Sequence, residues 1–436
     1  MIILLQIFFS ILSIAFAISY FTSKKRFSPS NILLSLWFAA IAISQIRLSH
    51  NENIWNSNFW IILLSFLGLF ILLYYLFEKH FDKKIKKTSL QSSNPSTIFF
   101  WLLILMTISS IIANIYIYWK FGTLPILSTQ PDSFRFIINK KLFGLWEYIA
   151  LFPRLSIPFS LFYIFLYKPK KWIKFGLWAN IIGGFIILSL YASRLVIIFP
   201  ILISYFSYLA INYDSFNVKK LAKATISVIV VVLFISIAIP AFRQSITYRD
   251  YNDPDAEKNP FTYISSLSGI SVPDQWKFIV PVYIIPSFNL QAMMRATDYY
   301  NYSNISAGAY SLSTFNPALK YFGIQLQQKI PWGELFLPWW VTGTFLLSWW
   351  VDFWYFGIIL ASIFLAVILS VFYLLAIKKP SFLTISIFSY LSFITIMTIY
   401  TNYFQRSELY IDLTVILVCS IALKMHLSKK VKRSTI

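Results

Sequence analysis

The sequence predicts an all-α, polytopic integral membrane protein with about eleven spanning helices and one large loop outside the membrane. Three observations predict this class. Of the 436 residues, 58% are hydrophobic and only 12% are charged, whereas soluble domains carry about 25% charged residues. Apolar runs of membrane-spanning length follow one another along the chain. One long segment, residues 243–350, interrupts these runs and is rich in aromatic, amide and hydroxyl side chains.

The first apolar run, residues 1–21, has no basic residue before it and is followed by Lys24, Lys25 and Arg26. A signal peptide carries its charges in front of the apolar run, so we interpret this run as a spanning helix with its N-terminus outside. Helix ends are uncertain by several residues, which allows about ten to twelve helices. The further runs are 31–46, 59–77, 98–119, 146–167, 175–190, 195–211, 224–242, 353–377, 382–400 and 409–425.

The distribution of charge sets the predicted orientation. With the N-terminus outside, the six predicted cytoplasmic segments contain 22 of the 37 lysines and arginines but only three of the 16 acidic residues. This is the positive-inside pattern, and it places the C-terminus in the cytoplasm and the 243–350 loop outside. A net charge of +21 would indicate nucleic acid in a soluble protein. Here it is a topology signal, so we expect a lipid bilayer and no nucleic acid as partner.

The chain is therefore predicted to have three parts. Residues 1–242 carry helices 1–8, residues 243–350 form the large extracytoplasmic loop subdomain, and residues 351–436 carry helices 9–11 and a basic cytoplasmic tail. The loop is predicted to contain short amphipathic helices, one over 290–300 and one over 315–326 that Ser313 or Thr314 would cap.

Arg154 lies inside a predicted spanning run. Pro153 and Pro158 remove backbone donors beside it, which predicts a kink in this helix. Glu147 precedes Arg154 by two helical turns and shares its face. Two interpretations stand: an internal ion pair that holds two helices together, or an anion-binding arginine in the membrane.

Arg194 ends a very short outer turn, Tyr191-Ala-Ser-Arg194, between two spanning runs. One interpretation is that its side chain snorkels to the membrane interface. The other is that it points into a cavity and binds an anion, because a guanidinium offers a rigid fork of donors that suits phosphate.

Further candidates lie on the predicted outer face. Asp352 stands close to the Gly-Thr turn at 343–344, as a site residue or as a helix N-cap. Glu408 and Asp412 share one helix face, and Arg406 is expected at most to neutralise them. Tyrosines of the large loop either stack on sugar rings or are interfacial aromatics; these are Tyr299, Tyr300 and Tyr310.

Several families of chemistry are excluded by the sequence. It contains no Walker loop, Rossmann fingerprint or nucleophile elbow. The single cysteine, Cys419, and three widely spaced histidines give no disulfide and no zinc-ligand spacing. Any catalysis must therefore run on the outer face, without ATP, on a substrate that carries its own leaving group.

Four stretches carry a resemblance to a known family. They are Leu190-Tyr-Ala-Ser-Arg194, Tyr283-Ile-Ile-Pro-Ser-Phe-Asn289, Thr342-Gly-Thr-Phe345, and Asp352-Phe353 with Gly357. With the helix count and the large outer loop near the C-terminal half, they resemble the O-antigen or oligosaccharide repeat-unit polymerases (Wzy type). One position departs from the family pattern, because Trp354 stands where that stretch usually has its glycine.

The resemblance implies a GT-C-like glycosyltransferase in the inner membrane, with its active site facing the periplasm. Such an enzyme joins undecaprenyl-diphosphate-linked repeat units into a surface polysaccharide, either the O-antigen of lipopolysaccharide or a capsule. An acceptor hydroxyl attacks the anomeric carbon of the growing chain and releases undecaprenyl diphosphate. The resemblance also implies that no metal or cofactor is needed, and that a chain-length regulator and a flippase act in the same pathway.

The resemblance further implies roles for individual residues. Fixed arginines would stabilise the charge that builds on the departing diphosphate, with Arg194 as first choice before Arg154, Arg243 and Arg295. A carboxylate would assist the attacking hydroxyl. The candidates for this carboxylate are Asp352, Glu334 and Asp298, and the three tyrosines above would bind glycan.

Three alternatives stand beside the polymerase. An O-antigen ligase-type transferase uses an outer-face histidine, and the only predicted outer histidine here is His50. A lipid-linked oligosaccharide flippase or other transporter is expected to have short loops on both sides, which the long outer loop argues against. A receptor or structural membrane protein is the third.

Overall fold

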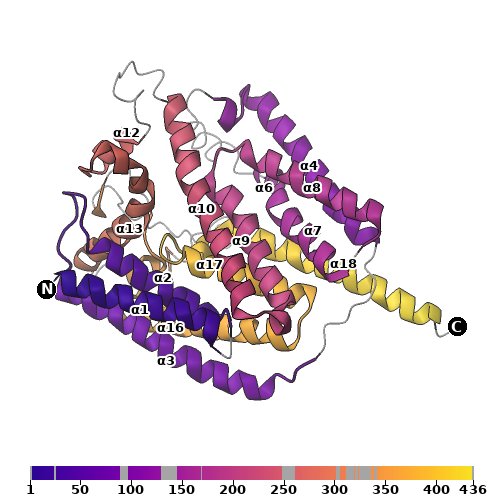
Figure 1. The fold of residues 1–436 in the computed structure, drawn as a ribbon, viewed down its shortest axis with the longest axis horizontal. Helices are drawn as coiled ribbons and strands as arrows, with labels where there is room; N and C mark the ends of the chain where they lie inside the picture. The colour runs from indigo at the N-terminus through magenta and orange to yellow at the C-terminus, as the bar shows by residue number, and fades with distance from the viewer. Residues whose placement is uncertain are drawn as a thin grey trace. The chain divides into compact units, whose positions relative to one another are not determined.

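The structure, a computed structural model, is helical throughout most of the chain that it describes (Figure 1). The described residues are 2–23, 26–88, 97–128, 145–167, 169–247, 261–300, 305–310, 319, 323, 335–337, 340 and 342–434. Within these ranges, the β-structure consists of one isolated antiparallel bridge, between Ser49 and Ile270.

Every predicted apolar run is helical. Within the described residues, eight helical stretches are long and apolar enough to cross a membrane. They are α1 (Ile2–Thr22), α3 (Ser57–Lys84), α4 (Thr97–Phe121), α6 with α7 (Leu145–Ala150 and Pro153–Tyr167), α8 (Lys171–Ser189), α9 (Arg194–Ile211), α10 (Val218–Thr247) and α16 (Phe345–Lys378). The remaining predicted runs correspond to the shorter apolar helices α2 (Pro29–Ser44) and α17 (Phe382–Met397), and to α18 (Ser407–Ser434).

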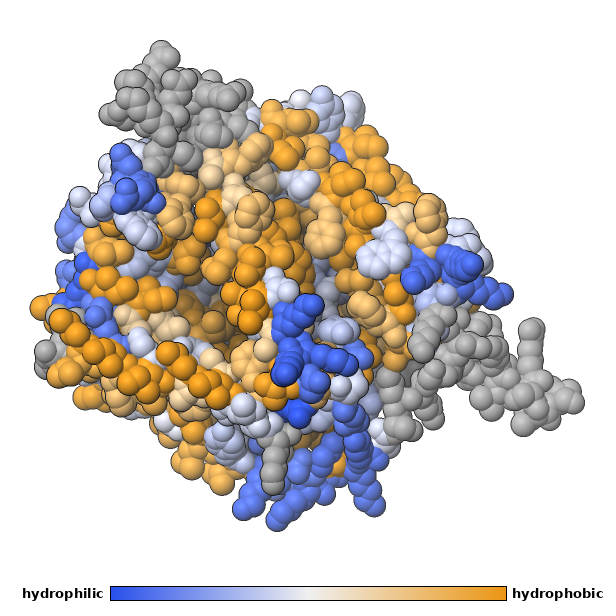
Figure 2. All heavy atoms as spheres, in the orientation of Figure 1, coloured by the Kyte–Doolittle hydropathy of each residue, from blue (hydrophilic) through white to orange (hydrophobic). Residues whose placement is uncertain are grey.

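The exterior of these helices is apolar. Only 11% of the membrane-spanning part of α1 and 6% of that of α10 is buried within the protein. Both helices expose isoleucine, leucine and phenylalanine side chains, and α10 exposes valine as well. Apolar side chains cover much of the face seen in Figure 2. An apolar exterior of this extent needs lipid around it. The chain is a multi-pass membrane protein; the number of crossings and the orientation stay predictions.

The chain forms two compact units that are interleaved in sequence. Unit 1 contains Met1–Lys87, Ile264–Lys378 and Leu391–Tyr410, and unit 2 contains Thr88–Tyr263, Lys379–Tyr390 and Ile411–Ile436. The described part of the predicted loop subdomain from Ile264 onward therefore packs with the first 87 residues. The division of the chain into three parts stays a prediction.

Unit 1 is built on two helix pairs, α3 with α16 and α1 with α2, and α13 (Val280–Tyr299) packs on α2. Trp37 is fully buried, and its indole Nε1 donates a hydrogen bond of 2.9 Å to Thr398 Oγ1. The helix predicted over 290–300 is found as the second half of α13, where most side chains are buried. The amphipathic character predicted for it stays a prediction. The predicted helix over 315–326 and its caps Ser313 and Thr314 lie outside the described residues, except that Leu319 is helical.

Helix α16 is sharply kinked. It begins at Phe345, eight residues before the predicted span, and Trp354 interrupts it with φ 52° and ψ −135°. Positive φ is where glycine is favoured, so Trp354 occupies a backbone conformation that would suit glycine. Beyond the kink, a Cβ added at Gly357 would lie 2.0 Å from the carbonyl oxygen of Trp349. Gly357 is therefore required for the close approach of the two halves.

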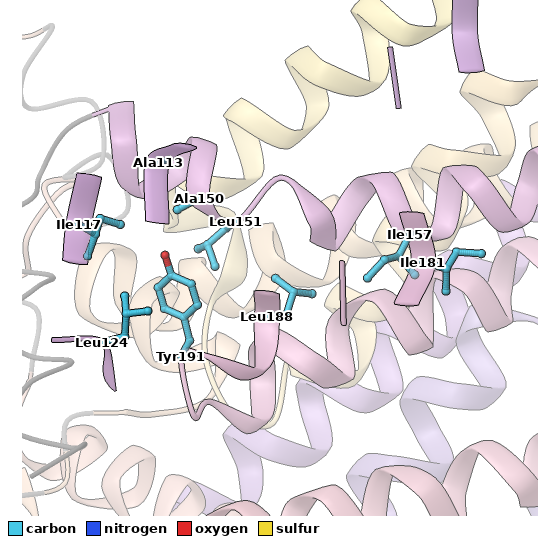
Figure 3. Packing of buried hydrophobic residues seen from close by; sticks show 9 residues of the cluster. All are labelled: Ala113, Ile117, Leu124, Ala150, Leu151, Ile157, Ile181, Leu188 and Tyr191. Carbon is cyan, nitrogen blue, oxygen red and sulfur yellow. The ribbon is translucent and has the colours of Figure 1, made fainter. Parts of the chain in front are cut away.

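Unit 2 packs α7 against α8 and α9, and α4 against α6, α7 and α8. Figure 3 shows the buried cluster at its centre, in which the Tyr191 side chain lies beside Leu124, Ala150 and Leu151. The predicted kink near Arg154 is confirmed, because the chain leaves the helical path between α6 and α7 and resumes at Pro153. The proline at the first position of α7 costs no hydrogen bond there.

Candidate functional site

A polar pocket of about 250 Å³ lies in unit 1. It is formed where three separate stretches of the chain meet: the segment that ends at Tyr310, the start of α16, and the turn between α17 and α18. The lining residues that matter below are Tyr310, Thr342, Thr344, Ser348, Asn402 and Arg406.

The turn before α16 is fastened to α13 through Asn289. The Oδ1 of this fully buried side chain accepts hydrogen bonds from Thr342 Oγ1 at 2.9 Å and from Trp340 Nε1 at 3.2 Å. Its amide nitrogen donates to the carbonyl of Ile285, one helical turn earlier. The stretch 283–289 and the stretch 342–345, both of which carry the resemblance, are thereby joined at one place.

Asp352 binds the segment that ends at Tyr310. Because the kink at Trp354 interrupts the helical hydrogen bonds of α16, the carbonyls of Val351 and Asp352 accept from the amides of Ser306 and Ala307, at 2.9 and 3.0 Å. The Asp352 side chain is fully buried, and its Oδ1 accepts from the Tyr310 amide at 2.9 Å. Asp352 lies inside α16 and not at its N-terminus, and it fixes the segment that carries Tyr310.

Tyr310 lines the pocket. Burial raises the pKa of its phenol, the negative charge of Asp352 raises it further, and the positive charge of Arg406 lowers it. The net pKa shift is upward, so the phenol stays protonated and can donate a hydrogen bond across the physiological range.

The far wall of the pocket is the turn before α18. Asn402 is fixed on both sides of its amide: Nδ2 donates to Ser348 Oγ at 2.6 Å, and Oδ1 accepts from the Phe404 amide at 3.1 Å. Arg406 lies with its guanidinium 5.7 Å from the centre of the Tyr403 ring. Among the described residues it forms no ion pair. The expectation that Arg406 neutralises Asp412 is therefore wrong.

Asp412 belongs instead to Arg154. In unit 2, Asp412 Oδ1 accepts from Arg154 Nη2 at 2.7 Å and Nε at 3.2 Å, and Oδ2 accepts from the Tyr390 hydroxyl at 2.7 Å. The guanidinium also lies 5.6 Å from the centre of the Phe199 ring. The two charged side chains are 7% and 2% exposed. The ion-pair interpretation of Arg154 is confirmed, with Asp412 as the partner.

Arg194 and Arg243, the two further candidate arginines in unit 2, have different surroundings. Arg194 is the first residue of α9, is half-buried, and follows a turn in which Ala192 has φ 47°. Arg243 is half-buried near the end of α10. Tyr191 is buried, which raises the pKa of its phenol, and the negative charge of Glu147 adds to the rise. Glu147 is thus a neighbour of Tyr191.

In unit 1, Arg295 and Asp298 fasten the loop between α2 and α3, residues 47–56. Arg295 Nη2 donates to the carbonyl of Asn51 at 2.9 Å, and its guanidinium lies 4.9 Å from the centre of the Phe336 ring. Burial lowers the pKa of Arg295. Asp298 is exposed and accepts from Asn56 Nδ2 at 2.7 Å. Both predicted site residues therefore have contacts that hold this loop.

The same loop is held by Glu52, whose Oε2 accepts from the Tyr283 hydroxyl at 2.6 Å and from the Ser49 amide at 3.0 Å. Burial raises the pKa of the Glu52 carboxyl, and these hydrogen bonds oppose the rise. Tyr283 also accepts from the Leu48 amide at 2.8 Å, so the first residue of the 283–289 stretch anchors the loop to α13.

Of the three predicted glycan-binding tyrosines, Tyr310 lines the pocket, Tyr300 is buried, and Tyr299 is 45% exposed with its ring edge-on to Tyr300. Glu334 lies outside the described residues. The sequence reasoning found no signal for Ser348 and Asn402, which have no pattern of their own. It undervalued Arg406, although an arginine in a short turn between two apolar runs was the signal used for Arg194.

The fold and the pocket define a multi-pass helical membrane protein with a polar pocket in unit 1. No family model, no curated protein and no solved structure matches this chain.

Proposed function

We propose that this chain is a membrane polymerase that joins undecaprenyl-diphosphate-linked oligosaccharide repeat units into a surface polysaccharide. One observation carries the proposal. The stretches 283–289, 342–345 and 352–357 resemble the polymerase family and are separate in sequence. In unit 1 they come together beside one pocket: Asn289 binds Thr342, and Asp352 binds Tyr310, and both Thr342 and Tyr310 line the pocket.

The reaction joins two lipid-linked glycans outside the membrane. The acceptor hydroxyl loses its proton and forms a bond to the anomeric carbon, while the bond from that carbon to the diphosphate oxygen breaks. The negative charge that leaves with undecaprenyl diphosphate is stabilised by fixed guanidinium groups. Arg194 is our first assignment for this role, with Arg243 next. Arg154 is already bound by Asp412, so we rank it below both.

The carboxylate that assists the acceptor hydroxyl must come within hydrogen-bond reach of it. Asp352 is fully buried behind Tyr310, so we assign it the positioning of Tyr310. Glu334 and Asp298 stay candidates for the base. Tyr310 itself donates to the glycan from the pocket wall.

Arg194→Ala is expected to leave the protein inserted and abundant while surface glycan carries only one repeat unit. A lost charge stabiliser of this kind costs about 10²–10³ in rate, enough to abolish long chains. The measurement is the length distribution of surface glycan on gels, in a deletion strain that expresses each variant at equal level. Arg47→Ala, which removes a half-buried arginine of unit 1, is the control variant and keeps long chains. The polymerase proposal would be excluded if the deletion strain without any expressed variant still made long glycan. It would also be excluded if the deletion stopped the lipid-linked repeat units from crossing the membrane.

The predicted orientation has its own test. In a chain with Cys419 replaced by serine, Ser266→Cys is expected to react with a membrane-impermeant maleimide added to whole cells, because Ser266 is exposed in α12 (Thr262–Leu267) and lies in the predicted outer loop. Ser215→Cys, exposed in a predicted cytoplasmic segment, is expected to react only after lysis. The reverse labelling pattern would place the pocket on the cytoplasmic side and end the polymerase proposal.

A further inference from the structure

The pocket in unit 1 lies at the N-terminus of α16. The helix begins at Phe345, whose amide donates to the carbonyl of Thr398, and nine residues precede the kink at Trp354. The N-terminal end of a helix carries a partial positive charge of about half a unit, which favours an anion beside it. Every helix has such an end, so it does not by itself indicate a ligand. Two side chains beside it provide independent evidence for one.

Thr344 is the first of them. It immediately precedes α16, the position where a threonine hydroxyl ordinarily accepts a hydrogen bond from the first turn. Its carbonyl accepts from the Leu347 amide, but its hydroxyl is buried and has no hydrogen-bond partner among the described residues. Thr344 is 1% exposed and lines the pocket. A buried hydroxyl without a partner is costly, so a ligand in the pocket would satisfy it.

Arg406 is the second. It is the charged residue of the pocket lining, and among the described residues it forms no ion pair. An arginine in a confined polar pocket gains most from an anionic partner, because its fork of donors matches a carboxylate or phosphate. The helix end and the Arg406 guanidinium therefore favour a negatively charged ligand, and the Thr344 hydroxyl can form a hydrogen bond to it.

The size and charge of the pocket narrow the class of anion. Its volume of about 250 Å³ is below the roughly 300–1,000 Å³ of sites for drug-sized ligands, which suits one sugar ring. Apart from Arg406 the lining contains neutral hydroxyl and amide groups, the groups that bind sugar hydroxyls. The positive charge at the pocket comes from one guanidinium and one helix end, and the negative charge of Asp352 behind Tyr310 reduces it. This balance suits a ligand with one negative charge better than a diphosphate, which carries several.

We propose that this pocket binds a single carboxylate-bearing sugar residue of the lipid-linked substrate, with the sugar carboxylate on Arg406 and the start of α16, and a ring hydroxyl on Thr344. The proposal rests on the proposed function for the statement that the sugar belongs to a lipid-linked glycan. It makes the pocket the site that selects an acidic repeat unit.

The test is direct binding to the full chain in detergent micelles, read by saturation-transfer difference NMR. The probes are the methyl glycosides of glucuronic, galacturonic and N-acetylneuraminic acid, with methyl glucoside as the neutral comparison and inorganic pyrophosphate as the other anion. We expect at least one acidic sugar to bind more tightly than the glucoside. Arg406→Gln should weaken its binding by about 10- to 100-fold, whereas Arg47→Gln, an arginine outside the pocket, should leave it unchanged.

Thr344→Val separates a role in ligand binding from a role in folding. Since its hydroxyl has no partner in the free protein, valine should leave the thermal unfolding midpoint unchanged or raise it, and weaken sugar binding by about 3- to 10-fold. Equal binding of acidic and neutral sugars, or no binding of any acidic sugar, would overturn the proposal. Pyrophosphate binding that depends on Arg406, without acidic-sugar binding, would assign the pocket to the lipid diphosphate. Because binding is read without polymerisation, acidic-sugar binding can hold even if the deletion strain makes normal glycan.

Discussion

Asp412→Ala is expected to destabilise unit 2 by about 3–5 kcal/mol, because it leaves the Arg154 guanidinium buried without its carboxylate. The wild-type pair is almost fully enclosed, with side chains 7% and 2% exposed and a shortest nitrogen–oxygen distance of 2.7 Å. Removing one partner leaves an uncompensated charge between helices, and the Tyr390 hydroxyl loses its acceptor as well. The measurement is the unfolding free energy of the purified protein in detergent, with the level of protein in the membrane as a second readout.

Two further variants give this prediction its controls. Tyr390→Phe removes one hydrogen bond to a charged group and is expected to cost about 1.5–3 kcal/mol. Replacing both charges, as Arg154→Met with Asp412→Leu, should recover most of the loss, because an apolar pair of similar volume needs no desolvation. If the double variant also keeps long-chain glycan, Arg154 has a structural role and does not bind diphosphate. An Asp412→Ala protein as stable as wild type would show that the ion pair contributes nothing.

Gly357→Ala is expected to destabilise unit 1 by about 3 kcal/mol, the upper end of the range for overpacking. The new Cβ would lie 2.0 Å from the carbonyl oxygen and 2.6 Å from the carbonyl carbon of Trp349, and 3.3 Å from the Phe353 Cβ. Since the first two are backbone atoms, no rotation of a side chain relieves the clash. The kink must open, and the contacts of Val351 and Asp352 with residues 306–310 would loosen with it. Polymerisation is expected to fall together with stability.

Gly68→Ala is the matched control for this variant. Gly68 lies in α3, the helix that packs along α16, and a Cβ at this position meets no atom within 4 Å. Alanine there should be neutral or stabilise by up to about 1 kcal/mol, because glycine is a poor helix former. Thermal unfolding of the two variants side by side measures the difference. If Gly357→Ala unfolds like Gly68→Ala, the two halves of α16 are not in contact at this point.

Local features of the structure were predictable, and long-range pairings were not. The apolar runs and the break before Arg154 follow from neighbouring residues, because spanning length and proline chemistry are local. The partner of Arg154 lies 258 residues away in Asp412, and spacing within one helix suggested only Glu147. The sequence predicts a later start for α16 because Thr342–Trp350 resembles the end of a loop, whereas Phe345 and Trp350 are fully buried in unit 1.

The candidate site shows the same division. Asp352 and the 342–345 stretch were found through their resemblance to a family, but their meeting with Asn402 and Arg406 depends on how α16, α17 and α18 pack. The positive φ of Trp354 could not be read from the sequence either, because tryptophan ordinarily avoids that conformation. The Trp354 ring contacts the rings of Trp350 and Tyr355. Glycine would adopt this backbone conformation without strain, but it would make no such ring contacts.

The interleaving of the two units has a consequence for biosynthesis. Unit 1 takes residues that are far apart in the chain, since Met1–Lys87 must join Leu391–Tyr410. At about 5–20 residues per second, the roughly 300 residues between these segments take about 15–60 s to synthesise. During that interval the Trp37 indole lacks its acceptor on Thr398, so the first three helices enter the membrane as an unfinished half. The packing of unit 1 around Trp37 can therefore be completed only when translation is nearly finished.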